Sequence, residues 1–173
     1  MSNFAAAFLR NDRMLFTLIN RRLHCRILDR YFGAITKLGS TPFIIMVASI
    51  VLYKLPSIGD RLAVNLIVSQ LIIHAFKRII NRSRPYEIMD CNLIYKPPQC
   101  IYSFPSGHSG ASFSTALVLS VEFPALLPIL YAVVFSVSFS RIYLGFHYVS
   151  DVVAGLAISY FTFLFLPFPF FVS

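Results

Sequence analysis

Long apolar runs separated by short polar breaks make up most of the chain after residue 34. The runs at 35–53, 62–80, 109–122, 124–139 and 149–166 each predict a membrane-spanning helix. A span needs roughly 20 mostly apolar residues, so the chain has room for five or six spans. The pattern therefore predicts an all-α, polytopic membrane helix bundle of five to six transmembrane helices.

The first 30 residues follow a different pattern. Their apolar stretches, at 4–9 and 14–19, are too short to span a bilayer and are interrupted by arginines. A secretory signal peptide would instead have a continuous apolar region followed by a small-residue cleavage site. We expect 1–30 to form an amphipathic helix in the membrane interface, and a sixth span within this segment is the alternative.

The composition agrees with a membrane protein. Of the 173 residues, 57% are hydrophobic and 13% are charged, and the mean hydropathy is +0.73. Soluble domains have about 45–50% apolar and about 25% charged residues, and a small one could not bury so much apolar surface. This excludes a soluble enzyme, a nucleic-acid-binding domain and a disordered chain. We expect one integral-membrane domain over 1–173, with a motif-bearing core at 60–165.

The net charge of +8 is concentrated in two clusters. Residues 1–30 contain six arginines against two aspartates, which favours contact with anionic headgroups or a topology signal. In the cluster at 77–96, Lys77 and Arg84 are seven residues apart, so on a continuous helix they would share a face two turns along. Pro85 would end that helix. Two cations on one face favour an anion site, although basic residues at a span end are commonly membrane anchors.

A second polar block, at 104–109, opens the third predicted span. Ser106 and Gly107 lead into an apolar run and predict a helix start, where backbone N–H groups and the helix dipole bind phosphate. His108 lies beside this start and could give a proton to a leaving oxygen. A single histidine at a helix end is more often a structural hydrogen bonder, but the neighbouring blocks favour the catalytic interpretation.

A third polar block lies between the fourth and fifth predicted spans. His147 and Asp151 are four residues apart and would share one helix face. A carboxylate bonded to one ring nitrogen fixes the tautomer and leaves the other nitrogen free to attack. Arg141 adds a forked donor suited to phosphate oxygens, and Gly145 permits a turn between them.

Taken together, the three blocks resemble the type-2 phosphatidic acid phosphatase family. The matching patterns are Lys-x6-Arg-Pro, Pro-Ser-Gly-His and Ser-Arg-x5-His-x3-Asp, in the family's order. The resemblance implies a metal-independent phosphatase or diphosphatase of lipid phosphates that needs no cofactor. It implies that His147 is a nucleophile forming a phosphohistidine, that Asp151 orients it, and that His108 protonates the leaving group. The groups implied to bind the phosphoryl oxygens are Lys77, Arg84, Arg141 and the Ser106 and Gly107 amides.

Other functions and substrates remain open at this point. A membrane transporter or flippase for a phosphorylated lipid could also use buried cations to bind its anionic substrate. A related haloperoxidase is disfavoured, because those enzymes are soluble and larger. A site for two metal ions is disfavoured, because the chain has only seven carboxylates that could serve as ligands. His24 and His74 match no motif position. The expected partners are membrane lipids and a lipid phosphate: phosphatidylglycerophosphate, undecaprenyl diphosphate, phosphatidate or lipid A phosphate.

The resemblance also implies a location. It places the site on the extracytoplasmic face of a bacterial inner membrane, although arginine-rich segments usually stay in the cytoplasm. Cys91 and Cys100 flank the long loop at 86–106, and Cys25 stands apart. A pair in one loop is typical of an oxidising compartment, so we expect a Cys91–Cys100 disulfide, worth about 2–3 kcal/mol. Two free thiols are the alternative.

Overall fold

The computed structural model describes residues 3–96 and 100–166, and within these ranges the chain is helical with no β-strand. Its elements in chain order are α1 (Asn3–Arg22), α2 (Arg26–Ile35), η1 (Thr36–Gly39), α3 (Thr41–Lys54), α4 (Pro56–Ile80), α5 (Pro85–Ile88), α6 (Gly107–Glu122), η2 (Pro124–Leu126), α7 (Leu127–Tyr143) and α8 (Val149–Phe165). The all-α prediction is therefore confirmed.

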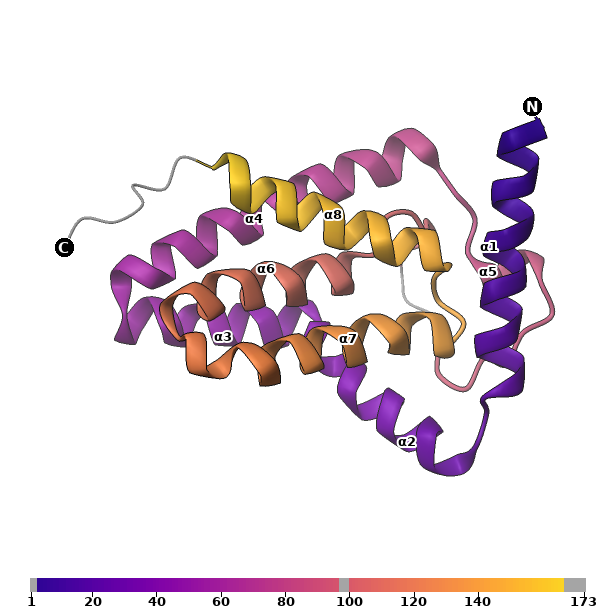
Figure 1. Cartoon of the computed structure of the whole chain (residues 1–173), viewed down its shortest axis with the longest axis horizontal. Helices are drawn as coiled ribbons and strands as arrows, with labels where there is room; N and C mark the ends of the chain where they lie inside the picture. Colours follow the sequence, from indigo (N-terminus) through magenta and orange to yellow (C-terminus); the bar gives the residue numbers. More distant parts are fainter. Residues whose placement is uncertain (1–2, 97–99, 167–173) are drawn as a thin grey trace.

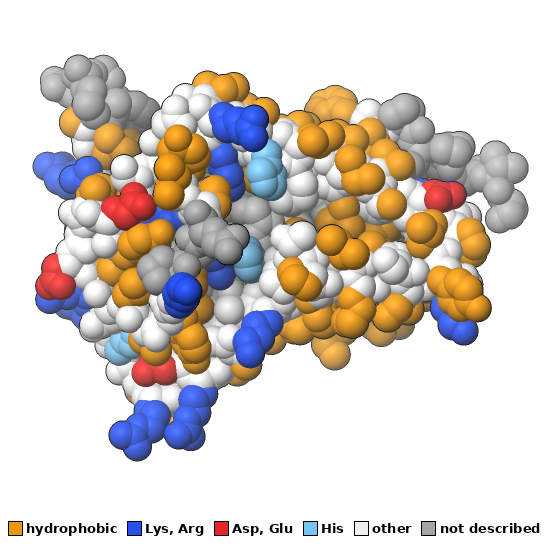
Figure 2. Space-filling model, turned by 180° about the vertical axis from the view of Figure 1, so that it is seen from behind, with side chains coloured by type: hydrophobic (Ala, Val, Ile, Leu, Met, Phe, Trp, Pro, Cys, Tyr) orange, Lys and Arg blue, Asp and Glu red, His pale blue; other side chains and the backbone are white. Residues whose placement is uncertain are grey.

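Helices α3, α4, α6, α7 and α8 run side by side along the long axis of the molecule, and α1 crosses one end of them (Figure 1). Helix α6 is central, because it packs against α3, α4, α7 and α8. Most Lys and Arg side chains gather at the end that carries α1 and α2, while hydrophobic side chains cover the flanks of the bundle (Figure 2). An apolar flank with a charged end suits a bundle embedded in a bilayer.

Small residues allow α6 and α8 to approach closely. A Cβ on Gly110 would lie 3.1 Å from Ser159 Oγ, and a Cβ on Gly155 would lie 2.4 Å from the carbonyl oxygen of Ser106. The Ser159 hydroxyl donates a 2.8 Å hydrogen bond to the Gly110 carbonyl. Such contacts through glycine and serine are typical of helix pairs in membranes. They fix the start of α6 against the side of α8.

Two predicted helix starts were wrong. The helix expected from residue 35 begins at Thr41, and the preceding Arg26–Gly39 segment meets it at a bend of 50°. The turn expected at 56–61 is instead the start of α4, with Pro56 in the first turn, where its fixed φ favours a helix start. Gly59 makes this possible, because its missing side chain leaves room for the Leu52 backbone.

The remaining spans follow the prediction more closely. Helix α6 starts two residues earlier than expected, α7 follows η2 and extends to Tyr143, and α8 ends one residue early. By length and hydropathy, Pro56–Ile80 and Pro124–Tyr143 could each cross a membrane, and the bent pair could form a third span. Helix α8 is apolar but shorter. The count of five to six spans therefore stays a prediction.

The N-terminal segment forms two helices where one was expected. Helices α1 and α2 are separated at residues 23–25, and α1 has a buried face formed by Asp12, Phe16 and Asn20. These positions are four residues apart, so they lie along one side of the helix. That side packs against the end of the bundle, near α7 and α8.

Candidate active site

The three polar blocks come together at the end of the bundle that α1 crosses. Four helix ends bring them there, because each block terminates or starts a helix. Lys77 lies in the last turn of α4 and Arg141 in the last turn of α7. Ser106 is the N-cap of α6, and Asp151 lies in the first turn of α8.

The expected helix through Lys77 and Arg84 does not form. Helix α4 ends at Ile80, and Asn81 adopts a left-handed backbone with φ 49°, a conformation that asparagine tolerates better than most residues. Arg84 is extended, with φ −78° and ψ 154°, as the following Pro85 favours. The two cations are therefore brought together by the loop that follows α4, and not by lying on one face of a single helix.

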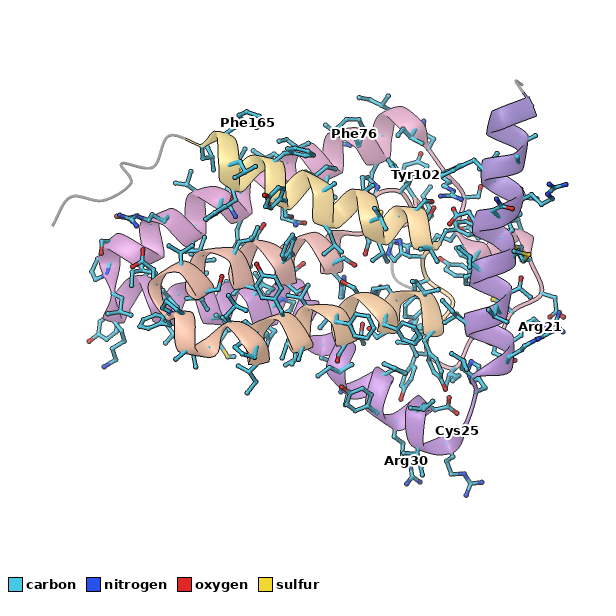
Figure 3. The ribbon with its side chains drawn as sticks, viewed as in Figure 1. Arg21, Cys25, Arg30, Phe76, Tyr102 and Phe165 are labelled. Carbon is cyan, nitrogen blue, oxygen red and sulfur yellow. The ribbon has the colours of Figure 1, made fainter. Side chains whose placement is uncertain are left out.

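Both cations bind backbone carbonyls of neighbouring loops. Lys77 Nζ donates to the Tyr102 carbonyl at 3.1 Å, and Tyr102 lies beside the end of α4 (Figure 3). Arg84 donates from Nε to the Cys100 carbonyl at 2.8 Å and from Nη1 to the Phe146 carbonyl at 2.9 Å. The side chains are 6% and 3% exposed. These bonds hold two strongly charged groups in place inside the protein.

A tight turn presents His147. Gly145 has φ +83°, a backbone that side chains disfavour, and the N–H groups of Phe146 and His147 both donate to the Arg141 carbonyl at 3.1 Å. The turn predicted at Gly145 is therefore present. Helix α8 begins only at Val149, so His147 precedes it and the expected common helix face is wrong.

His147 and Asp151 nevertheless face each other. His147 Nδ1 lies 3.5 Å from Asp151 Oδ2, which also accepts the Tyr148 N–H at 2.9 Å. The 3.5 Å separation exceeds a normal hydrogen bond, and Nδ1 has no closer partner among the described residues. On the other side of the ring, Nε2 lies 3.3 Å from Arg84 Nη1.

The surroundings keep the His147 ring neutral. Burial lowers its pKa well below 6.5, and the nearby charges of Arg84, Arg141 and Lys77 lower it further. Desolvation and like charges both disfavour an imidazolium. A neutral ring has a lone pair on one nitrogen, which is the state needed for attack on phosphorus.

Arg141 and His108 complete the charged cluster. Arg141 is 3% exposed and donates from Nη1 to Thr36 Oγ1 at 2.7 Å, while its buried Nε has no partner among the described side chains. The charges of Arg141, Arg84 and Lys77 act on His108 as well as on His147. The same three cations therefore influence both histidines electrostatically.

The start of α6 is tied to the same cluster. Ser106 Oγ bonds the hydroxyl of Ser109 at 2.9 Å and caps the helix, while the Ser106 N–H donates to the Asp151 carbonyl at 2.8 Å. Gly107 leaves room for the Gln70 side chain beside it. The predicted phosphate-binding turn is thus bonded directly to the helix that carries Asp151, and this bond occupies the Ser106 N–H that was expected to hold a phosphoryl oxygen.

The predicted disulfide is not formed, since Cys91 and Cys100 are both free thiols. Cys91 packs next to Gly145, whereas the Cys100 sulfur points to the Tyr102 carbonyl at 3.8 Å. The two sulfurs thus have separate partners, and a disulfide needs a specific backbone separation that spacing in sequence does not provide.

His24 and His74 bond elsewhere. His24 pairs with Asp29 at 3.0 Å, and His74 bonds the Gln70 carbonyl within α4.

Two residues near the cluster were missed by the sequence analysis. Arg82 binds Asp151 Oδ1 at 2.7 Å, and Asp12 of α1 binds Arg82 at 2.7 Å. Asp12 is 70 residues from Arg82, so no local spacing indicates the contact.

A comparison with known families decides the classification. The profile of the PAP2 superfamily matches residues 61–169. The chain belongs to this superfamily. The undecaprenyl-diphosphatase of Sulfolobus acidocaldarius is 31% identical over 101 residues, which are 57% of this chain and 48% of the relative. The lipid A 1-phosphatase of Rhizobium etli is 36% identical over 107 residues, which are 58% of this chain and 45% of the relative. The chain thus spans about half the length of these relatives.

Solved structures of PAP2 proteins show the same fold. The crystal structure of Aquifex aeolicus LpxE matches with a TM-score of 0.80 at 27% identity, over 87% of this chain and 91% of the other. A transmembrane PAP2-type phosphatidylglycerolphosphate phosphatase from Bacillus subtilis matches with a TM-score of 0.74 at 24% identity, over 91% and 83% of the two chains. Together with the apolar helices, these matches identify this PAP2 protein as an integral membrane protein.

Proposed function

We propose that this PAP2 protein is a lipid phosphatase that removes phosphate from a phosphomonoester or diphosphate headgroup through a phosphohistidine. The observation that carries the proposal is the convergence of three buried cations, Lys77, Arg84 and Arg141, on a neutral His147 that faces Asp151. Phosphoryl transfer depends mainly on positioning and on charge stabilisation. Three fixed cations provide that stabilisation without a metal ion or cofactor.

The geometry supports a separate role for each ring nitrogen of His147. Nδ1 faces Asp151, which favours a proton there and a lone pair on Nε2. Nε2 forms the bond to phosphorus as the bond from phosphorus to the lipid oxygen breaks. Once the bound anionic phosphate offsets the three cations, His108 can carry a second ring proton, and it gives that proton to the lipid oxygen. His108 then takes a proton from water, which attacks phosphorus and releases inorganic phosphate and free His147.

An apolar cavity beside this cluster supports a lipid substrate. It has a volume of about 340 Å³ and lies between α3, α4 and α6, with Gly107 among its lining residues. Most of its other walls are aliphatic, including Ile44, Leu52 and Ile67. An acyl or prenyl chain placed there would leave its phosphate next to the start of α6. The relatives' names include undecaprenyl diphosphate and lipid A substrates, and both are phosphorylated lipids with long apolar chains.

The experiment is phosphate release by the purified full chain in mixed micelles. The substrates are phosphatidylglycerophosphate, undecaprenyl diphosphate, phosphatidate and lipid A phosphate, each with and without a metal chelator. We expect release from at least one substrate, with chelator present, together with an acid-labile phosphoenzyme that is absent in His147→Ala. A transporter or flippase would release none from any of the four, and that result would refute the proposal.

We further propose that residues 1–173 form one domain with five to six membrane spans and a motif-bearing core at 60–165. In this proposal α1 lies in the membrane interface, and the site faces outward from a bacterial inner membrane. Cys100 supports a direct test, since its side chain is exposed and its carbonyl binds Arg84. A Cys25→Ser, Cys91→Ser variant leaves it as the single thiol. A membrane-impermeant maleimide should label it in intact cells, and labelling that requires lysis would place the site in the cytoplasm.

A further inference from the structure

Arg82, which is half-buried, forms the centre of an ionic network behind the proposed nucleophile. Its Nη1 donates to Asp151 Oδ1 and to Ser150 Oγ, both at 2.7 Å, and its Nη2 donates to Asp12 Oδ2 at 2.7 Å. The guanidinium also lies 3.9 Å from the centre of the Tyr148 ring. A forked guanidinium is suited to holding two carboxylates at once. Arg82 therefore connects α1 to the first turn of α8.

The network leaves Asp151 one oxygen for His147. Arg82 engages Oδ1, while Oδ2 accepts the Tyr148 N–H and faces His147 Nδ1. Because both oxygens are bonded, the plane of the carboxylate is fixed relative to the imidazole. Rotation of Asp151 would lengthen the 3.5 Å separation from Nδ1, so Arg82 determines whether that contact can tighten.

Helix α1 fixes Arg82 in turn. Asp12 is 5% exposed and accepts the Ser150 N–H at 3.0 Å, so it binds the start of α8 as well as Arg82. One turn further along the same face, Phe16 packs edge-on against Tyr148 at 5.6 Å. After another turn, Asn20 donates to the Tyr143 carbonyl at 2.8 Å. The segment that carries His147 is thus bonded to α1 on both sides.

We propose that Arg82, held by Asp12, is a positioning residue that orients Asp151 and, through it, His147. The proposal rests on the lipid phosphatase function given above. Arg82 does not need to touch the substrate, since its donors are directed at Asp12, Ser150 and Asp151. The N-terminal helix, which lies outside the matched PAP2 region, then becomes part of the catalytic apparatus.

The first test is steady-state kinetics of Arg82→Gln, Arg82→Lys and Asp12→Asn in the full chain. The probe is dioctanoyl phosphatidate or, if wild-type protein cleaves it poorly, the best of the four lipid phosphates. A misplacement of about 1 Å costs roughly 100-fold in rate, so we expect kcat of Arg82→Gln to fall about 10- to 100-fold with little change in KM. Arg82→Lys keeps the charge without the fork and should give an intermediate kcat.

Matched controls separate positioning from general damage. Arg78→Gln and Asp90→Asn remove the same charges from exposed side chains and should keep wild-type kcat. In an Asp151→Asn background, Arg82→Gln should cost little further, because residues that act through one another are not additive. The proposal would be overturned if Arg82→Gln lowered kcat as much in the Asp151→Asn background as in the wild type. It would also be overturned if Arg82→Gln alone kept wild-type kcat.

A substrate-free measurement keeps the proposal separate from the proposed function. The ¹⁵N chemical shifts of the His147 ring report its tautomer in protein labelled at histidine. We expect a single tautomer with Nδ1 protonated in the wild type and a mixture in Arg82→Gln. If the His147 spectrum of Arg82→Gln equals that of the wild type, the positioning role is refuted, even if the wild type cleaves none of the four lipids. If the two spectra differ as expected but the wild type cleaves no lipid, only the lipid phosphatase function is refuted.

Discussion

Substitution of Gly155 by alanine tests whether the contact between α6 and α8 sets the geometry of the site. The new methyl carbon would lie 2.4 Å from the Ser106 carbonyl oxygen, 3.3 Å from its carbonyl carbon and 3.4 Å from its nitrogen. Ordinary contact begins near 3.4 Å, so the two segments must separate by about 1 Å. The Ser106 backbone cannot yield freely, because its N–H binds Asp151 and its carbonyl accepts from Gly110.

Two effects of Gly155→Ala follow from this displacement. Overpacking of this kind typically costs about 1–3 kcal/mol of stability. The same shift moves the Ser106–Gly107 turn away from Asp151, and a misplacement of about 1 Å reduces the rate roughly 100-fold. Thermal unfolding in detergent measures the first effect, and phosphate release at saturating lipid phosphate measures the second.

The matched control is Gly59→Ala, at the α3–α4 hairpin. Its methyl group would lie 2.2 Å from Leu52 Cα, so the overpacking is comparable, but it acts on a wall of the apolar cavity and not on Ser106 or Asp151. We expect a similar loss of stability with kcat of the folded fraction unchanged. Wild-type kcat in Gly155→Ala, or an equal loss of kcat in both variants, would refute the argument that this contact positions the phosphate-binding turn.

Three further predictions concern the chemistry of the site. His147→Ala should abolish phosphate release, and near-normal release from the folded variant would contradict the role of His147 as nucleophile. Asp151→Asn should lower kcat about 10³- to 10⁴-fold, as loss of an orienting carboxylate does in other enzymes. Because burial and three cations lower the pKa of His147, its ring should stay neutral as the pH falls through 6.5, and a ¹⁵N titration showing protonation at or above pH 6.5 would be inconsistent with this. Activity should persist in excess chelator and be inhibited by vanadate; restoration by added magnesium after chelation would instead indicate a metal mechanism.

The parts of the fold that could be predicted depend on local pattern. Helix α8 was located within one residue, because an uninterrupted apolar run follows the polar Ser150–Asp151 pair. The clustering of the site could also be anticipated, since each block lies where a predicted span begins or ends. The helix boundaries at Pro56 and Asn81 could not, because they depend on a tight packing contact at Gly59 and on a left-handed turn.

The hydrogen bonds between segments that are distant in sequence could not be predicted. Asp12 lies 70 residues from Arg82 and 138 residues from Ser150, and a single chain contains no signal for such pairs. The Cys91–Cys100 pair shows the opposite error, because closeness in sequence suggested a bond that the loop geometry does not make.

Helix α1 has two faces with separate consequences for membrane orientation. Asp12, Phe16 and Asn20 are buried against the site, while Arg10 and Arg13 on the other side are exposed. Lys77 and Arg84 of the site are instead buried and bonded to backbone carbonyls. A topology signal counts positive side chains in exposed loops near the spans, so the buried cations add little to it. The arginines of α1 must lie on the same side of the membrane as the site, because the helix that carries them is bonded to Arg82 and Ser150.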